Sequence, residues 1–340
     1  MKNKKILIVG SDERFALERM YYRAFKEVGS KVDFLHVFKI RKQLISKFIW
    51  KYFRFLFFFL IRIKIFYYLK KNQKKYDLII FFKGLYIKNN FLKILKKNFN
   101  SKIINIYSDN PLNTSYFKDI SNQNVLNSIP VFDYFFIFSK KILKKISLKL
   151  KCDNIFYLPF ANDPKLHKKK TSKCQTKYDI SFVGTADRER FLLINNLKKY
   201  KIILAGDGWK QYKLNNNVNY IGNIQEKKFA KVICESYVSL NIFRKQNEGS
   251  HNMKTFEIPA MGGLMITKRS KEQNFFFPEN KACIMYKNVD ELLKKIEVIV
   301  KNPNKFNHIK KRGYYYSKNN TYKKRAIYIL NTIFKNEKNI

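Results

Sequence analysis

Residues 241–263 read NIFRKQNEGSHNMKTFEIPAMGG and contain the parts of one β-α unit in order. An apolar strand end opens the segment, and a polar loop follows it. The loop leads into a helix that we expect to begin near Met253. The helix should stop at Gly262 and Gly263, because glycine readily adopts the backbone conformation that ends a helix. The next apolar run, 264–267, then reads as another strand.

The same alternation of short apolar runs and longer helix-like segments extends along the chain in both directions. Most of the runs are continuously apolar, as expected for parallel strands that are covered on both faces. The runs that we interpret as strands are 5–10, 32–38, 76–83, 102–108, 134–139, 155–160, 178–184, 201–205, 218–222, 238–243, 264–267 and 282–286. This alternation predicts doubly wound α/β sheets.

A polar, lysine-rich stretch with Pro164 separates the first six runs from the second six. Such a composition is typical of a linker, which we assign to residues 165–177. The predicted fold class is α/β, with two Rossmann-like parallel-sheet domains, 1–164 and 178–316, facing each other across a cleft. Residues 317–340 are expected to form a terminal helix that crosses back to the first domain. In such sheets, ligands bind at the carboxyl ends of the strands.

The chain of 340 residues carries 70 Lys and Arg against 25 Asp and Glu, a formal net charge of +45. Such a charge is typical of proteins that bind nucleic acid, anionic membranes or acidic substrates. The chain is also crowded with Lys, Asn, Ile, Phe and Tyr, the set that AT-rich coding favours. Because the basic residues are spread along the chain, we favour compositional bias and expect no nucleic-acid partner.

The four cysteines, Cys152, Cys174, Cys234 and Cys283, form no Cys-x-x-Cys pair. A chain of this length does not need disulfides for stability, so we interpret all four as reduced thiols with no zinc site. The apolar run at 5–10 is short and reads as the first strand rather than as a signal peptide. These features predict a cytoplasmic protein.

Residues 48–69 are very apolar, but Lys51, Arg54, Arg62 and Lys64 interrupt them. No charge-free run approaches the ~20 residues that span a bilayer. We favour a buried crossover helix. The alternative is an amphipathic helix that lies in the membrane interface and gives peripheral contact at the inner face of the membrane.

The first strand ends in Gly10-Ser11-Asp12 rather than in Gly-x-Gly-x-x-Gly, and the chain has no Walker pattern. A nicotinamide, flavin or P-loop nucleotide site is therefore poorly supported. Two Rossmann-like domains without a dinucleotide fingerprint favour an enzyme that uses a nucleotide sugar.

The segment at 241–263 has the chemistry of a diphosphate site. Its loop and helix start offer backbone N–H groups and the positive end of a helix dipole. Arg244 and Lys254 add charge and donors. Glu257 shares the face of Lys254, because residues i and i+3 of a helix are neighbours, and its carboxylate can accept both hydroxyls of a ribose. The alternative is that Arg244 and Glu257 form a solvated ion pair.

The segment resembles the donor-binding signature of the spore maturation protein B-like (CgeB-like) glycosyltransferase family. That family has an Asn-x-x-Arg strand end, an Asn-x-Arg-x-Phe-Glu helix start and a following Gly-Gly. Further pieces resemble it in the same order: Tyr107-Ser108-Asp109-Asn110-Pro111, Tyr157-Leu158-Pro159-Phe160, Ser181-Phe182-Val183-Gly184, Gly206-Asp207-Gly208-Trp209, and Thr321-Tyr322 with Arg325.

This resemblance implies the GT-B fold, a nucleotide-diphosphate sugar as co-substrate, no further cofactor and no obligatory metal. The expected donor-binding residues are Arg244, Glu248, Lys254, Thr255, Glu257, Gly262, Gly263, Gly184, Arg188, Gly206 and Asp207. Glu248 lies one residue further from Glu257 than the wider GT-B pattern has, and Arg188 reads equally well as a helix-face charge. Lys254 replaces the usual Arg, and Asn320 stands where the family often has His.

Two residues are candidates for catalysis. Asp109 follows a strand and is a candidate general base for an acceptor hydroxyl; the alternative, which we favour slightly, is a turn cap. His251 lies in the donor loop and is the second candidate. Of the other residues, His167 is expected at the surface, and Trp209 either lines the donor base or packs inside the domain.

The sequence therefore predicts a glycosyltransferase that moves a sugar to a hydroxyl on a surface glycan, a lipid-linked precursor or a protein. The first domain would hold the acceptor and the second the nucleotide sugar. The alternative is a non-catalytic basic module of the same fold that binds an anionic polymer or a membrane surface.

Overall fold

The computed structural model describes residues 3–37, 47–71, 76–112, 120–170, 174–224 and 227–335. The chain divides into two compact units. The first comprises Met1–Pro159 together with Tyr322–Ile340, and the second comprises Phe160–Thr321. Each unit holds one six-stranded sheet, so the predicted fold class of two Rossmann-like sheets is confirmed.

The sheet of the first unit is parallel throughout, in the order β2-β1-β3-β4-β5-β6. Its strands are β1 (Lys5–Gly10), β2 (Lys31–His36), β3 (Leu78–Phe82), β4 (Lys102–Tyr107), β5 (Tyr134–Ile137) and β6 (Ile155–Tyr157). The central strand β3 reads Leu-Ile-Ile-Phe-Phe and is buried at all five positions. Continuous burial is why these strands lack the alternation of a half-exposed sheet.

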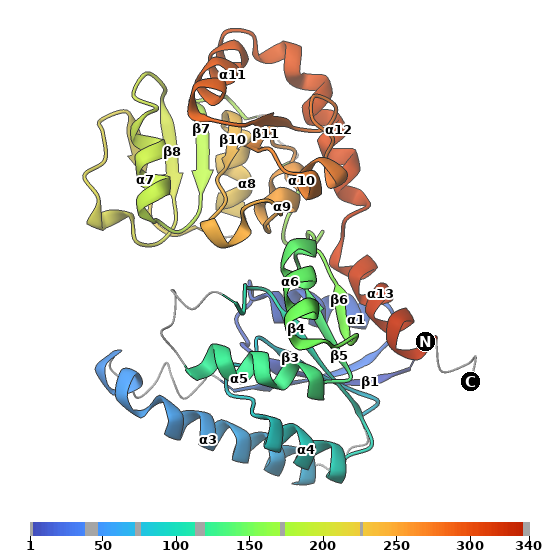
Figure 1. Ribbon diagram of the computed structural model, residues 1–340. Coiled ribbons are helices and arrows are strands. Elements are labelled where there is room, and N and C mark those ends of the chain that lie inside the picture. The colour runs from blue at the N-terminus through green and yellow to red at the C-terminus, as the bar shows by residue number, and fades with distance from the viewer. Residues whose placement is uncertain are drawn as a thin grey trace. The chain divides into compact units, whose positions relative to one another are not determined.

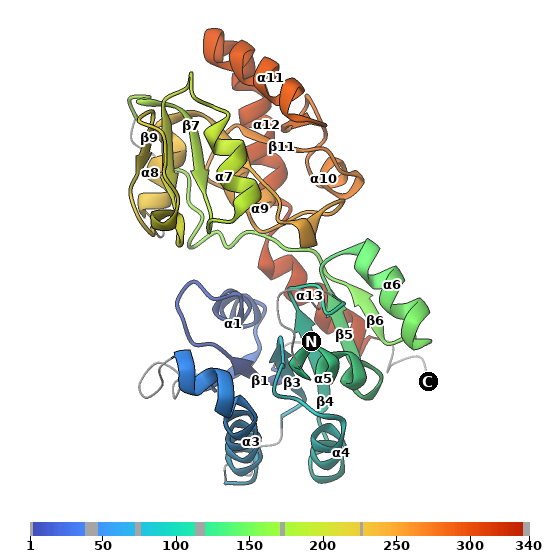
Figure 2. The ribbon, with the colours of Figure 1, turned by 60° about the vertical axis from the view of Figure 1, so that its left-hand side comes forward.

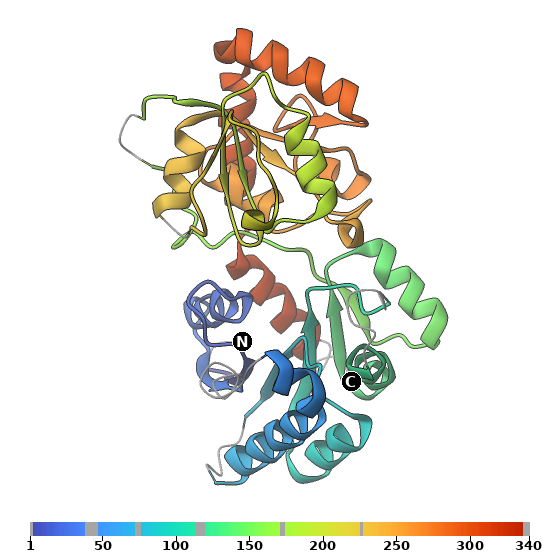
Figure 3. The same ribbon diagram turned by 90° about the vertical axis from the view of Figure 1, so that its left-hand side faces the viewer.

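Helices cover both faces of this sheet. They are α1 (Leu17–Glu27), α3 (Lys47–Lys71), α4 (Asn89–Asn98), α5 (Ile120–Ser128), η1 (Ile129–Val131), α6 (Lys140–Leu150) and α13 (Tyr322–Phe334). Right-handed crossovers place α1 on one face and α3, α4 and α5 on the other (Figure 3). The last helix, α13, packs beside α1 (Figure 1), where the rings of Tyr21 and Tyr322 lie 5.1 Å apart.

Helix α3 connects β2 to β3 and buries only one of its faces. Ile61, Ile65 and Leu69 face the sheet and are buried, whereas Phe55 and Tyr67 are 72% and 65% exposed. The prediction of a buried crossover helix therefore holds for one face of α3 and not for the other. The side chains of residues 47–54 lie outside the described residues. Among the described residues, no helix combines the length and apolarity needed to cross a bilayer.

The second unit has its own parallel sheet, in the order β12-β11-β10-β7-β8-β9. Its strands are β7 (Tyr178–Val183), β8 (Ile202–Ala205), β9 (Val218–Tyr220), β10 (Ser236–Asn241), β11 (Met265–Lys268) and β12 (Ile284–Tyr286). The strand order reverses between β7 and β10. Such a switch point, at the carboxyl ends of the strands, is where open α/β sheets bind their ligands.

The helices of the second unit are short apart from the last two. They are α7 (Arg188–Asn195), η2 (Trp209–Gln211), α8 (Lys227–Cys234), η3 (Lys245–Asn247), α9 (Lys254–Ala260), α10 (Lys271–Phe276), α11 (Val289–Lys301), η4 (Pro303–Phe306) and α12 (Asn307–Lys318). Helix α12 packs along α9 (Figure 2). Helix α9 begins one residue after the predicted start and ends before the glycine pair, as the sequence indicates.

The expectation that all four cysteines are reduced thiols is wrong for two of them. Cys174 and Cys234 form a disulfide, with Cα atoms 5.9 Å apart and a separation of 60 positions in the sequence. Cys234 ends α8, which packs on β7 just after Cys174. Only this packing brings the two together, so no sequence spacing indicates the pair. Cys152 and Cys283 are free thiols.

The segment expected as a linker, 165–177, is part of the second unit rather than a free connection. Its start is held down, because Leu166 and His167 are buried despite the lysines around them. The boundary lies earlier, after Pro159, and the chain leaves the second unit after Thr321.

Candidate functional site

Two predicted glycines meet at the carboxyl edge of the second sheet. Gly184 follows β7, and Gly206 follows β8 with a φ of +132°. A Cβ on Gly206 would lie 2.1 Å from the carbonyl oxygen of Gly184, so the two backbones approach more closely than any side chain permits. Trp209 Nε1 donates to the same oxygen over 2.8 Å. This tryptophan is fully buried, which is the packed alternative of the sequence analysis.

Arg190, which the sequence analysis missed, ties the ends of β7 and β10 together. Its guanidinium donates to the carbonyls of Thr185 and Ile242 over 2.8 and 2.7 Å and is 8% exposed. The predicted Arg188 starts the same helix but is exposed. The available signal was Asp187, which caps α7 by accepting the Arg190 N–H and thereby sets this arginine on the inner face.

Arg244 lies at the same edge, just after β10. Its Nε is 3.9 Å from Asp187 Oδ2, and Arg190 Nε is 3.5 Å from the same oxygen. One carboxylate thus stands between two guanidinium groups, and Arg244 keeps about a third of its side chain exposed. Guanidinium groups at a strand end suit a phosphate ligand.

Glu257 is buried on the first turn of α9, beside two basic side chains. Lys254 Nζ is 2.6 Å from one carboxylate oxygen, and His167 Nε2 is 3.6 Å from the other. Burial alone would raise the pKa of Glu257, but the charge of Lys254, the nearby His167 and the hydrogen bond from Lys254 together hold it below the usual value. Glu257 is therefore a carboxylate at neutral pH. It pairs with Lys254 and His167, whereas Arg244 pairs with Asp187.

His167 is buried, not at the surface as expected from its lysine-rich surroundings. Its Nδ1 accepts the backbone N–H of Asp163 over 2.9 Å. A ring nitrogen that accepts a hydrogen bond carries no proton, so the proton of the neutral ring lies on Nε2, which faces Glu257. The same interaction explains the burial, since a carboxylate inside the unit needs a donor.

His251 is placed to hold the loop rather than to meet a ligand. The side chain is fully buried, and Nε2 accepts the N–H of Phe160 over 3.2 Å. Nδ1 lies 3.0 Å from Glu272, which also accepts the hydroxyl of Ser250. Both ring nitrogens are engaged within the unit, so this geometry suits a positioning residue and not the catalytic role predicted for His251.

Two other predicted residues of the loop have local partners. Thr255 is buried and donates to Gln273 over 2.7 Å, so it packs beneath the loop. Glu248 is more than half exposed and lies 2.7 Å from Lys268. Neither of these contacts brings Thr255 or Glu248 into the group around Glu257.

The remaining predicted residues of this unit occupy turns. Gly262 has a φ of +78°, which suits its position after α9, and the N–H of Gly263 returns to the carbonyl of Ile258. Asp207 follows β8 and accepts the side-chain amide of Asn223 over 3.2 Å. Gly184, Gly206, Asp207 and Arg244 thus all lie at carboxyl ends of strands in one sheet.

Asp109 belongs to the first unit, where it follows β4. Its carboxylate lies 2.8 Å from Lys83 Nζ, and both side chains are partly exposed. The turn cap is the neighbouring Asn110, which accepts the N–H of Leu112 over 3.0 Å. Asp109 is therefore left at the strand end as an accessible carboxylate in an ion pair. Within the described residues, no three His, Cys, Asp or Glu side chains gather as a metal site.

Part of the chain, including much of this site, is similar to a known protein family. Residues 188–331, which include the Arg244–Glu257 segment, match the family model described as glycosyl transferase-like. The chain carries a glycosyl transferase-like domain. This domain begins with α7 and includes the carboxyl ends of β8, β10 and β11. No curated protein sequence matches the chain.

Solved structures show the fold of the whole chain. Sucrose-phosphate synthase from Thermosynechococcus elongatus is 12% identical, with a TM-score of 0.73 over 96% of this chain and 97% of that one. HepE from Anabaena, solved with UDP and glucose, is 12% identical, with a TM-score of 0.66 over 97% and 99%. A glycosyltransferase from Rickettsia africae is 14% identical, with a TM-score of 0.66 over 99% and 100%. The predicted GT-B fold is confirmed.

Proposed function

We propose that this protein is a glycosyltransferase that moves a sugar from a nucleotide-diphosphate sugar to a hydroxyl acceptor. The observation that carries the proposal is the ionised, buried Glu257 at the start of α9, inside the glycosyl transferase-like domain. Each carboxylate oxygen has more than one lone pair, so we propose that Glu257 accepts the ribose hydroxyls beside its contacts with Lys254 and His167. HepE, of the same fold, was solved with UDP.

The leaving diphosphate would be stabilised by protein cations. Arg244 is partly exposed at the end of β10 and supplies such a charge. Fixed donors and charges of this kind act on charge that develops as the sugar–phosphate bond breaks. We therefore propose that transfer needs neither a metal nor a further cofactor.

The acceptor is proposed to be a hydroxyl of a surface glycan, a lipid-linked precursor or a protein. Asp109, at the end of β4, is the proposed general base, since an acceptor hydroxyl must lose its proton during transfer. In the Asp109–Lys83 pair the lysine would hold the carboxylate in place until the acceptor arrives.

We further propose that the first unit docks on an anionic lipid surface through the exposed face of α3. Phe55, Phe59 and Tyr67 expose half or more of their side chains on this one helix. Lys70 and Lys71 end the helix, and the net charge of +45 adds attraction to anionic headgroups. An apolar face with basic residues at its margin is typical of helices that lie in a membrane interface.

A thermal-shift panel of nucleotide-diphosphate sugars tests the function. A donor at about 100 times its Kd should stabilise the folded protein by about 2.7 kcal/mol. Purified protein should then release the nucleoside diphosphate from that donor, with and without EDTA. Binding without any turnover, even with candidate acceptors, would favour the non-catalytic module. The absence of any binding donor would refute the proposal.

A further inference from the structure

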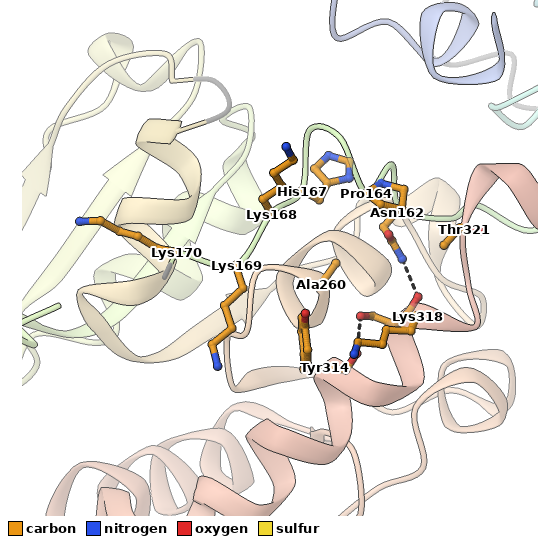
Figure 4. A pocket seen from close by; sticks show the side chains of 11 residues that line it. Asn162, Pro164, His167, Lys168, Lys169, Lys170, Ala260, Tyr314, Lys318 and Thr321 are labelled. Carbon is orange, nitrogen blue, oxygen red and sulfur yellow. Dashed lines mark hydrogen bonds between the residues drawn. The ribbon is translucent and has the colours of Figure 1, made fainter. Parts of the chain in front are cut away.

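The second unit contains a cavity beside the group around Glu257. The cavity has a volume of about 580 Å³ and lies between the segment that follows Asn162, the end of α9 and helix α12 (Figure 4). Its wall carries Lys168, Lys169, Lys170 and Lys318. Among the described residues that line it there is no carboxylate. The volume is that of a site for a small molecule.

The positive charge of this cavity is concentrated around one aromatic ring. Figure 4 shows Tyr314 between Lys169 and Lys318, whose ammonium groups lie 5.5 and 5.0 Å from the ring centre. One turn earlier on α12, burial lowers the pKa of Lys310, and the charge of Lys169 lowers it further. Neighbouring ammonium groups repel one another, and an anion that binds between them relieves this repulsion.

The wall of the cavity is fixed before any ligand arrives. The side-chain amide of Asn162 donates to the carbonyls of Ser317 and Asn320 over 2.8 and 2.7 Å. The stem of Lys169 lies against Gly262, where an added Cβ would meet its Cγ and Cδ at 3.0 Å. These contacts hold the segment, α12 and the turn after α9 together. The stem of Lys169 fits against Gly262 because glycine has no side chain to displace it.

We propose that this cavity binds a small organic phosphate. Lysine ammonium groups bind phosphate as point charges, and the ring of Tyr314 holds two of them, those of Lys169 and Lys318, at the cavity. The cavity also adjoins the proposed donor site, because His167 lines it and contacts Glu257. Two sources of the phosphate are compared below, the acceptor and a separate effector. Binding of a phosphate in the cavity does not require that the protein be a glycosyltransferase.

Amine acetylation followed by mass spectrometry tests the site directly, with pyrophosphate and inorganic phosphate as probes. We expect pyrophosphate to protect Lys168–Lys170 and Lys318 at concentrations that leave Lys198 and Lys294 unprotected, since both are exposed elsewhere on the unit. Equal protection of all these lysines would mean general charge attraction and would overturn the proposal. So would an absence of protection in the cavity.

Calorimetry with pyrophosphate provides the matched test. It is done in an Arg244→Gln background, which removes the proposed diphosphate contact. We expect Lys169→Gln with Lys318→Gln to weaken pyrophosphate binding at least tenfold, and the control pair Lys198→Gln with Lys294→Gln, of equal charge change, to leave it unaltered. All four lysines are exposed, so the fold should survive. Equal weakening by both pairs would refute the site.

The transfer assay separates the two sources of the phosphate. If the group belongs to the acceptor, added inorganic phosphate will compete with the acceptor and raise its KM. If it belongs to a separate effector, phosphate will change kcat without such competition. Either result supports the cavity as a phosphate site, and phosphate that changes none of these constants in the wild type contradicts it.

Discussion

Glu257 is the residue on which donor binding is proposed to depend. Glu257→Gln keeps the shape of the side chain and removes its charge. A hydrogen bond to a charged group contributes about 1.5–3 kcal/mol, so we expect the Kd of the donor to rise roughly tenfold to a hundredfold. Calorimetry measures this, with the exposed Glu297→Gln as the control of equal charge change. Unchanged affinity would remove Glu257 from the donor site.

The same residue gives the protein a pH dependence. The pKa of Glu257 in the folded chain lies below the usual 4.5, to which it returns on unfolding. Its ion pair therefore stabilises the fold above the unfolded pKa, and this contribution is lost as the pH falls through the folded value. Urea denaturation should show the wild type losing stability below pH 4.5 more steeply than Glu257→Gln does. Parallel curves would contradict the ion pair.

Gly206 has a requirement that Gly222 lacks, although both have positive φ. A Cβ on Gly206 would lie 2.1 Å from the Gly184 carbonyl, whereas one on Gly222 would meet no atom within 4 Å. We expect Gly222→Ala to cost about 1–2 kcal/mol, the strain of a left-handed residue, and Gly206→Ala to cost about 2 kcal/mol more through overpacking. Denaturation midpoints compare the two, and equal losses would refute the close approach.

At the scale of elements, the disulfide links the segment before β7 to the end of α8. It closes a loop of about 60 residues, for which the chain-entropy estimate is a stabilisation of about 4 kcal/mol. Urea denaturation with and without reductant should show this difference. Cys152→Ser should respond to reductant as the wild type does, because Cys152 is a free thiol. In Cys174→Ser, reductant should have no further effect.

Helix α3 is the element proposed to meet the lipid surface. Anionic vesicles should co-sediment with the protein at physiological salt, where exposed charges are screened beyond about 8 Å. Phe55→Ser with Phe59→Ser should lower the bound fraction severalfold, because both side chains are exposed. The control pair is Leu148→Ser with Leu192→Ser, two exposed leucines on other helices. Binding that disappears at physiological salt would be charge attraction alone.

The strands could be predicted from the sequence because most of them are continuous apolar runs. The short, continuously apolar run 78–82 indicates a covered strand, and a start of α9 near Met253 follows from the polar loop before it. The disulfide and the burial of His167 could not be predicted in this way. Both arise from segments far apart in sequence, and neither cysteine spacing nor a lysine-rich neighbourhood indicates a partner that only folding supplies.

The same limit applies to where the predicted site residues lie in the fold. Gly206 was predictable, since a glycine after a strand indicates a turn. Arg190 was not predictable, because its guanidinium donates to two backbone carbonyls, and one of them belongs to a residue 52 positions away in the sequence. His251 was chosen for its chemistry, and its neighbours in space leave its ring no access to a ligand.

At the scale of the whole molecule, charge and fold act separately. The +45 charge is carried by a chain with the GT-B fold. Two local groups of basic residues are proposed to act in binding: the four lysines on the cavity wall and the basic end of α3. The two surfaces can be tested independently, because they lie in different units.

Helix α13 closes the first unit although it comes after the entire second unit in the chain. During synthesis, β1 to β6 leave the ribosome with the face of α1 that receives Tyr322 still bare. About 160 residues must follow before α13 can cover it, which at ~5–20 residues per second is a delay of roughly ten to thirty seconds. Until then the first unit exposes an apolar face of the kind that chaperones bind, and a ribosome that stalls within the second unit would leave that face exposed.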